Sequence, residues 1–148
     1  MRAVHALVLA WLPAALCCGG SGAASPSITA LSELSGRWDG TLTITQVGGC
    51  AWVGGPMVVS QDWTVTDAGQ LTFPEPPFVA TWSGTITSDL KVTATRMEIN
   101  TCAGSSNTFS TAYSGVILRD GSYRVNLEGT GTPCPPCNFK YVYSLTKR

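Results

Sequence analysis

From residue 37 onward, apolar and polar residues alternate along the chain with a period of two. The alternation comes in short runs, separated by Gly, Pro, Asp and Asn at intervals of about 8–15 residues. Threonine is abundant and no run sustains a helical period, so the pattern predicts strands throughout. We expect eight strands, at residues 37–47, 57–66, 70–74, 78–87, 90–100, 108–118, 122–131 and 138–146.

Each expected strand has one apolar face and one polar face. In the first strand, Trp38, Leu42 and Ile44 point to one side and the threonines between them to the other. This pattern is typical of a sheet that is wet on one face only. An outer-membrane barrel would turn its apolar face outward to lipid. Because the second face here is Thr, Ser and charge, the pattern favours a soluble barrel with its aromatic residues inside.

We therefore predict an all-β fold, an eight-stranded up-and-down antiparallel β-barrel. Closure removes the exposed edges that an open eight-stranded sheet would carry. The alternative is a β-sandwich, because Cys50, Trp63 and Cys102 loosely imitate immunoglobulin spacing. Both cysteines fall in Gly-rich connections rather than inside strands, which favours the barrel.

The fifth strand interrupts the pattern. Arg96 and Glu98 continue the parity of its apolar face, whereas Met97 and Ile99 fall on the opposite side. A bulge near Thr95 that swaps the two faces is the favoured interpretation. The alternative places Arg96 and Glu98 inside the barrel as a polar ligand contact, since buried charges need pairing or a function.

The connections divide into two groups if the strands run up and down in chain order. Those at 67–69, 88–89 and 120–121 are tight turns, and Asp120-Gly121 is a good hairpin signal. Those at 48–56, 74–77, 101–107 and 133–137 are longer. The expected shape is a cup with one tight end and one loop-rich end.

Four cysteines, Cys50, Cys102, Cys134 and Cys137, fall at the loop-rich end and predict two disulfides in an exported chain. We expect Pro135-Pro136 to extend the backbone, which would separate Cys134 from Cys137 by roughly 9 Å. That distance exceeds the limit for a bridge. Bridges from Cys134 and Cys137 to Cys50 and Cys102 are therefore favoured, in either order.

The N-terminus has a basic start followed by an apolar run too short to span a membrane. This is the pattern of a secretory signal, which we place at residues 1–24. A lipoprotein signal ending before Cys18 is the alternative, with Cys18 or Cys17 acylated and the domain anchored to a membrane surface. Residues 25–36 would form an N-terminal arm and a short helical plug, and residues 37–148 the barrel. The expected location is the cell envelope, the periplasm or the extracellular space.

Composition narrows the function. Charged residues make up 12% of the chain and the formal net charge is zero, which argues against nucleic-acid binding. The only histidine, His5, lies in the signal, so the mature chain has no imidazole for a catalytic triad or a metal site. We expect no catalytic residues, no metal and no cofactor.

Gly36-Arg37-Trp38 places Gly-x-Trp at the start of the first strand, and Lys147 and Arg148 follow the last strand. This arrangement resembles the calycin barrels of the lipocalins and avidins. The resemblance implies a lipocalin-like barrel whose closed end is plugged by Gly36 and Trp38, with Arg148 or Lys147 packed over Trp38 as a cation–π contact.

Glu33-Leu34-Ser35-Gly36-Arg37-Trp38 also resembles the start of the small periplasmic barrels that inhibit bacterial metalloproteases. That resemblance implies a flexible arm, here residues 25–31, that enters a protease cleft.

The leading functional prediction is a non-enzymatic barrel that holds a small apolar or amphipathic molecule. The alternative is a protein-interaction module, such as a protease inhibitor or an envelope lipoprotein. Membrane contact is expected only through a lipid anchor. The candidate ligand-binding residues are Trp52, Trp63, Trp82, Phe73, Phe78, Tyr113, Tyr141 and Arg96.

Overall fold

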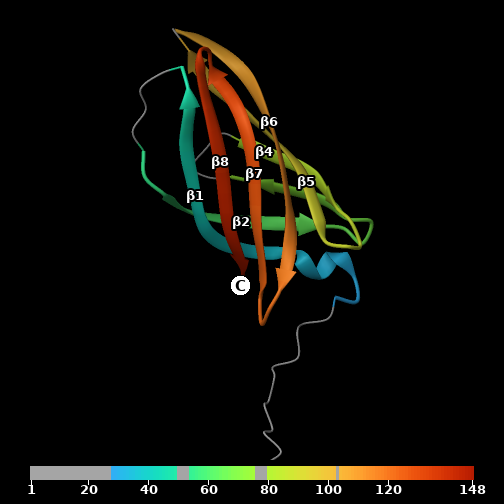
Figure 1. Ribbon diagram of the computed structural model, residues 1–148. Coiled ribbons are helices and arrows are strands. Elements are labelled where there is room, and N and C mark those ends of the chain that lie inside the picture. Colours follow the sequence, from blue (N-terminus) through green and yellow to red (C-terminus); the bar gives the residue numbers. More distant parts are fainter. Residues whose placement is uncertain (1–27, 50–53, 76–79, 103) are drawn as a thin grey trace, which may run out of the picture.

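The computed structural model describes residues 28–49, 54–75, 80–102 and 104–148. Eight strands pair antiparallel in chain order, and the first pairs with the last to close a barrel (Figure 1). This confirms the predicted barrel and shows the β-sandwich alternative to be wrong. The elements are η1 Leu31–Leu34, β1 Gly36–Gly48, β2 Met57–Val65, β3 Gln70–Pro74, β4 Ala80–Ile86, β5 Lys91–Cys102, β6 Ser105–Arg119, β7 Tyr123–Cys134 and β8 Cys137–Lys147.

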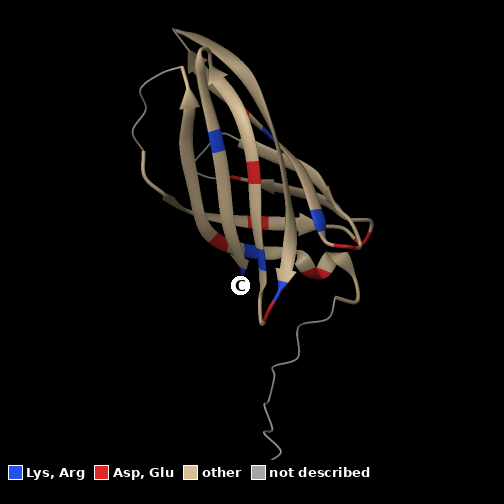
Figure 2. Ribbon diagram, in the orientation of Figure 1, with Lys and Arg blue, Asp and Glu red and all other residues tan. Residues whose placement is uncertain are grey.

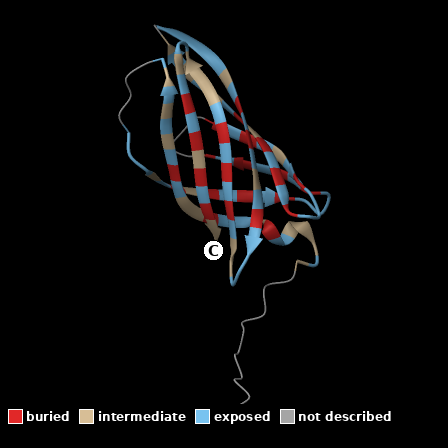
Figure 3. Cartoon of the chain, viewed as in Figure 1, coloured by how far each residue is buried: buried red, intermediate tan, exposed pale blue. Residues whose placement is uncertain are grey.

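Buried and exposed residues alternate along the strands, as the apolar periodicity predicts (Figure 3). The inward residues form one apolar cluster that extends through the barrel. The outward residues are mainly Thr, Ser and charged side chains.

The closed end is sealed by η1 and the start of β1. Leu34 and Trp38 are fully buried, and the indole Nε1 of Trp38 donates to the carbonyl of Leu34 at 3.0 Å. Ser35 then ties this segment to β2, because its hydroxyl donates to the carbonyl of Val65 and accepts from the Val65 N–H. The chain therefore enters the barrel through a fixed corner.

Strand β5 contains no bulge, so the favoured interpretation of its reversed pattern is wrong. Its pairing with β4 and β6 runs without a register shift through Thr95. Arg96 is 4% exposed and points inward, whereas Met97 and Ile99 are exposed on the outer face. The register holds because the buried guanidinium is paired inside the barrel, as described below.

Two connections at the open end are shorter than expected. Strands β5 and β6 pair as far as Cys102 and Ser105, and β7 and β8 pair as far as Cys134 and Cys137. Pro135 and Pro136 form the turn between β7 and β8, and Cys134 lies opposite Cys137 in the ladder, so the expected extended proline segment is wrong. The open end therefore carries two long hairpins that rise above the rest of the barrel (Figure 1).

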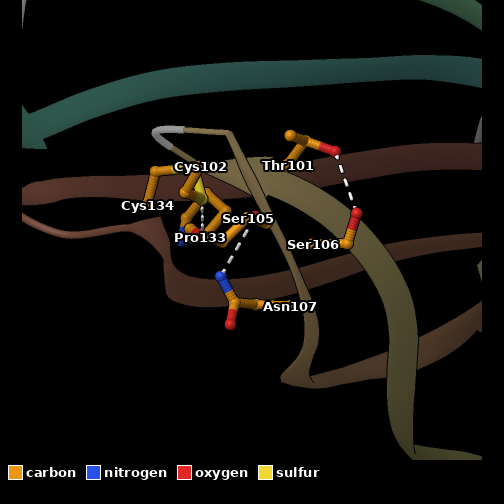
Figure 4. The surroundings of a disulfide bond; sticks show 7 residues. All are labelled: Thr101, Cys102, Ser105, Ser106, Asn107, Pro133 and Cys134. Atoms are coloured by element: carbon orange, nitrogen blue, oxygen red, sulfur yellow. Dashed lines mark hydrogen bonds between the residues drawn. A yellow bond between two sulfur atoms is a disulfide. The ribbon is translucent and has the colours of Figure 1, made fainter.

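A disulfide joins the tips of these hairpins. Cys102 and Cys134 are bonded with a Cα–Cα distance of 5.5 Å, beside the carbonyl of Pro133 (Figure 4). Cys137 is disulfide-bonded as well, and Cys50 lies outside the described residues. The sequence left open whether Cys134 pairs with Cys50 or with Cys102, and the structure shows the bond to Cys102.

Candidate functional site

The barrel interior is occupied by a column of aromatic rings. Trp38 stacks on Trp63 with ring centroids 4.4 Å apart, and Phe73 lies between Trp63 and Trp82 at 5.5 and 4.9 Å. Trp82 then contacts Tyr113 at 4.6 Å. The column crosses from β1 through β2, β3 and β4 to β6, because an inward position on each strand carries a ring.

The column continues toward the open end through β8. Tyr113 lies 6.3 Å from Tyr141, and Tyr141 lies 6.2 Å from Phe139. Tyr143 packs edge-on against both Trp82 and Tyr113. The structure thus brings together five of the predicted ligand-binding aromatics, and their rings pack on one another. These five are Trp63, Phe73, Trp82, Tyr113 and Tyr141; Trp52 and Phe78 lie outside the described residues.

A buried polar network lies against this column and is centred on Glu75. Arg96 Nε donates to Glu75 Oε2 at 2.6 Å, and the guanidinium of Arg96 also pairs with Glu98. The indole Nε1 of Trp82 donates to the same Glu75 oxygen at 3.0 Å. The guanidinium of Arg96 thus lies between two carboxyl groups, all three side chains being 1–13% exposed, so each of these buried charged groups has a partner of opposite sign within the chain.

Gln61 extends the network to β2. Its side-chain amide donates to Glu75 Oε1 at 3.4 Å, and its carbonyl oxygen accepts from the indole Nε1 of Trp63 at 3.0 Å. Inward-facing side chains on β2, β4 and β5 are thereby connected, through Glu75 at the end of β3, by side-chain hydrogen bonds. The network fixes the orientation of two tryptophan rings in the column.

The sequence interpretation missed Gln61 and Glu75. Gln61 has the inward parity of Val59 and Trp63, and Glu75 continues the inward parity of Leu71 and Phe73. Strand parity alone assigns both side chains to the inside of the barrel. The apolar pattern does not, because both residues are polar and Glu75 lies between prolines. Arg96 was anticipated only by the alternative that placed it inside.

Burial and neighbouring groups change the acid–base properties of the site. Burial alone would lower the pKa of Arg96, but the adjacent Tyr143 and the Glu75 carboxyl raise it. Burial, followed by the charge of Glu98, raises the pKa of Tyr141 to about 12. Burial also raises the pKa values of Tyr113 and Tyr143. All three phenols therefore keep their protons at neutral pH and can donate hydrogen bonds.

Two buried hydroxyls near the network have no hydrogen-bond partner in the structure: Thr111 Oγ1 and Tyr113 Oη. Thr111 is the direct cross-strand neighbour of Arg96, and Tyr113 packs on Trp82. A buried hydroxyl without a partner costs about 1–3 kcal/mol. These are polar groups that a bound molecule could satisfy.

Two glycines on β7 leave room for the side chains beside this region. A Cβ on Gly129 would lie 2.6 Å from the carbonyl oxygen of Ala112, and one on Gly131 would lie 2.6 Å from the ring of Phe109 and 2.7 Å from Thr111 Oγ1. Larger residues at these positions would displace the wall that faces Thr111 and Tyr113.

At the closed end, Gly36 adopts a φ of +114° and Trp38 is buried, in the positions that the resemblance implies. The exposed side chain of Arg148 pairs with Asp39 at 3.1 Å. Lys147 is the cross-strand neighbour of Trp38 in the ladder of β1 and β8, and it therefore has the same inward parity.

Within the described ranges, no group of three or more His, Cys, Asp or Glu side chains is placed to hold a metal ion. The same residues contain no helix long and apolar enough to cross a membrane.

Taken together, the topology and the interior define an eight-stranded up-and-down barrel compatible with a lipocalin-like arrangement. No protein-family model matches the chain, and neither a curated protein nor a solved structure shows significant similarity to it.

Proposed function

We propose that the chain is an exported, non-enzymatic binding barrel that holds a small amphipathic molecule near its open end. The observation that carries the proposal is the pair of unpartnered buried hydroxyls on Thr111 and Tyr113. Most buried polar groups in folded proteins are hydrogen-bonded. A ligand that supplies polar atoms there would remove an energetic cost that the chain alone leaves in place.

The aromatic column limits where such a ligand sits. Its rings occupy the interior from Trp38 to Tyr141, so a ligand would lie against the upper end of the column rather than along the barrel axis. Phe139, Tyr141 and the half-buried Phe109 provide apolar contact at that end. The site therefore favours a small molecule with a short apolar body.

The polar part of the ligand is a neutral group in this proposal. Arg96 pairs with both Glu75 and Glu98, so each of these buried charged groups already has a partner of opposite sign. The unmet hydrogen-bonding capacity belongs to hydroxyls, each of which can donate and accept. An alcohol or an amide fits that capacity better than a carboxylate or an ammonium group.

Native mass spectrometry of the exported chain, produced in an oxidising host, tests the proposal directly. An adduct that disappears on denaturation is the expected result, and its mass would begin to identify the ligand. Titration with n-alkanols and n-alkyl amides of increasing length, followed by tryptophan fluorescence, provides a defined probe. If neither experiment shows binding, the barrel is a filled scaffold and a protein-interaction role replaces this proposal.

Matched tyrosine variants locate the binding. We expect Tyr113→Phe to weaken alkanol binding by about tenfold, since it removes one hydrogen bond to the ligand. Tyr123→Phe, a half-buried tyrosine at the closed end of β7, is the control and should leave binding unchanged. Equal losses in the two variants would contradict a site at the upper end of the column.

A further inference from the structure

Two carboxyl groups share one guanidinium inside the barrel, but they are not equally supplied with donors. Among the described residues, Arg96 is the one basic side chain that is buried, and it pairs with both Glu75 and Glu98. Glu75 also accepts hydrogen bonds from Trp82 at 3.0 Å and from Gln61 at 3.4 Å. Donors from β2, β4 and β5 therefore surround the Glu75 carboxylate.

Glu98 has fewer donors. In the part of the chain that the structure describes, its polar contact is the ion pair from Arg96 Nη1 to Oε2. An ionised carboxylate can accept about four hydrogen bonds over its two oxygens. Glu98 therefore keeps acceptor positions that Arg96 does not fill. Its side chain is 13% exposed, against 1% for Glu75, so solvent reaches it.

The position of Glu98 is beside the proposed ligand site. It is the next inward residue after Arg96 toward the open end of β5. Its cross-strand neighbour on β6 is Phe109, and Thr111, with its unpartnered hydroxyl, is the next inward residue on that strand. On β8, the charge of Glu98 contributes, after burial, to the raised pKa of Tyr141. Strands β5, β6 and β8 thus present polar groups to one region at the upper end of the aromatic column.

No second cation on the wall of β5 and β6 meets Glu98. No charged residue follows it on β5, and the charged residue of β6 is Arg119, at the opposite end of that strand (Figure 2). Solvent therefore supplies the donors for its remaining acceptor positions. A ligand at the upper end of the column displaces that solvent. Dehydrating a carboxylate is costly unless the ligand donates a hydrogen bond in return.

We infer that Glu98 selects, among neutral ligands, those whose polar group donates a hydrogen bond. Alcohols and primary or secondary amides meet this condition, whereas ethers, ketones and tertiary amides do not. The inference rests on the proposed function and narrows it. The hydroxyls of Thr111 and Tyr113 do not make the distinction, because each can donate or accept. A site that needs a donor rejects an analogue without one, because its own polar group is then left unpaired.

Isomeric probes that differ in one donor test the inference. We compare n-hexanol with methyl pentyl ether, and hexanamide with N,N-dimethylbutanamide, by titration of the chain and tryptophan fluorescence. The members of each pair contain the same atoms, so they differ mainly in the donor. We expect the donor-bearing member to bind at least about tenfold more tightly. This comparison uses the parent chain and does not depend on the folding of a variant.

Glu98→Gln changes the group that faces the ligand from an acceptor to a donor. Because the guanidinium of Arg96 needs an acceptor, the carbonyl oxygen of the new side chain should stay with Arg96 and its NH2 group should turn toward the ligand. Arg96 keeps its ion pair with Glu75 in this variant. We expect the preference for the donor-bearing member of each pair to fall below about twofold, since an ether oxygen can now accept from the amide.

The matched control is Glu128→Gln. Glu128 lies on the outer face of β7, is half exposed and pairs with Lys140 at 2.7 Å. This variant should keep the preference of the parent chain within about twofold, because its carboxyl is remote from the interior.

The outcomes separate this inference from the proposed function. If no probe binds, the proposed function fails and this inference fails with it. Tighter binding of n-hexylammonium than of n-hexanol would contradict the neutral polar group on which both depend. If the probes bind but the two members of each pair bind equally, Glu98 does not select donors, although the binding site stands. The same conclusion follows if the preference persists unchanged in Glu98→Gln.

Discussion

The bond between Cys102 and Cys134 joins two hairpins at a level where their backbones do not pair. Among the described residues, the pairing of β6 with β7 ends at Tyr113 and Gly129 on the side of the open end. Above that level β6 remains paired with β5, and β7 remains paired with β8. The disulfide and the contact of Phe109 with Gly131 therefore hold the upper seam of the barrel together.

Replacing both cysteines, in Cys102→Ser/Cys134→Ser, should lower the free energy of unfolding by roughly 2–4 kcal/mol, as expected for a loop of this length. Part of this loss is local to the upper seam, because β6 and β7 have no backbone hydrogen bonds there that could hold the two hairpins together without the disulfide. Urea unfolding gives the total. Hydrogen exchange should accelerate at residues 105–112 and 130–134 but not at residues 91–95, and uniform acceleration would show that the bond does not act on the seam.

Arg96→Met should destabilise the barrel strongly. It leaves the carboxyls of Glu75 and Glu98 buried beside an apolar side chain, and breaking a buried pair typically costs about 3–5 kcal/mol. Arg124→Met, which breaks the half-exposed pair with Asp120, is the control and should cost less than about 1 kcal/mol.

The double variant Arg96→Met/Glu75→Gln separates burial of an unpaired charge from loss of packing. It should recover part of the stability lost in Arg96→Met, as measured by urea unfolding. Equal stability of the single and double variants would mean that Arg96 stabilises the barrel through the packing of its side chain and not through its charge pairing with Glu75.

The barrel could be predicted from the sequence because the apolar residues of the strands follow the two-residue period, from which β5 departs only at Arg96 and beyond. Trp38, Trp63 and Trp82 were placed inside from parity alone, and their burial confirms that placement. The polar network could not be predicted with the same rule, because parity assigns a side but does not say which buried polar groups find partners. Gln61 and Glu75 become acceptable inside only when Arg96 and the indole donors meet them across four strands.

The open end was harder to predict for a different reason. Gly, Pro and Asn predict turns, yet the segments around Cys102 and Cys134 continue as paired strands up to two-residue connections. Cross-strand pairing there outweighs the local preference of those residues. The pairing of Cys102 with Cys134 followed from the topology, which a single sequence leaves undetermined.

Asp39 makes the stability of the closed end sensitive to acid. Its hydrogen bond from Ser60, together with Arg37 and Arg148, lowers its pKa from 3.8 to about 2. A carboxyl with a lowered pKa stabilises the fold above its unfolded value and loses that effect as the pH falls through its folded value. The free energy of unfolding should therefore decrease between about pH 4 and pH 2.

Asp39→Asn removes this titration. Urea unfolding at several pH values should show a shallower decrease between pH 4 and pH 2 for Asp39→Asn than for the parent chain. Asp89 also has a pKa lowered to about 2, by Lys91 and Thr87, so some acid sensitivity remains in the variant. Identical pH profiles for the two chains would show that the Asp39 contacts do not persist in solution.

Gly40 allows β1 and β8 to approach at the point where β1 curves over the closed end. A Cβ there would lie 1.8 Å from the carbonyl oxygen of Ser144, which is backbone and cannot rotate away. Gly40→Ala should therefore separate the two strands and cost at least about 3 kcal/mol in urea unfolding. Gly48→Ala, in the same strand with nothing within 4 Å of its Cβ, should change stability by less than about 0.5 kcal/mol. Similar costs at both positions would show that the loss reflects strand propensity and not the contact between β1 and β8.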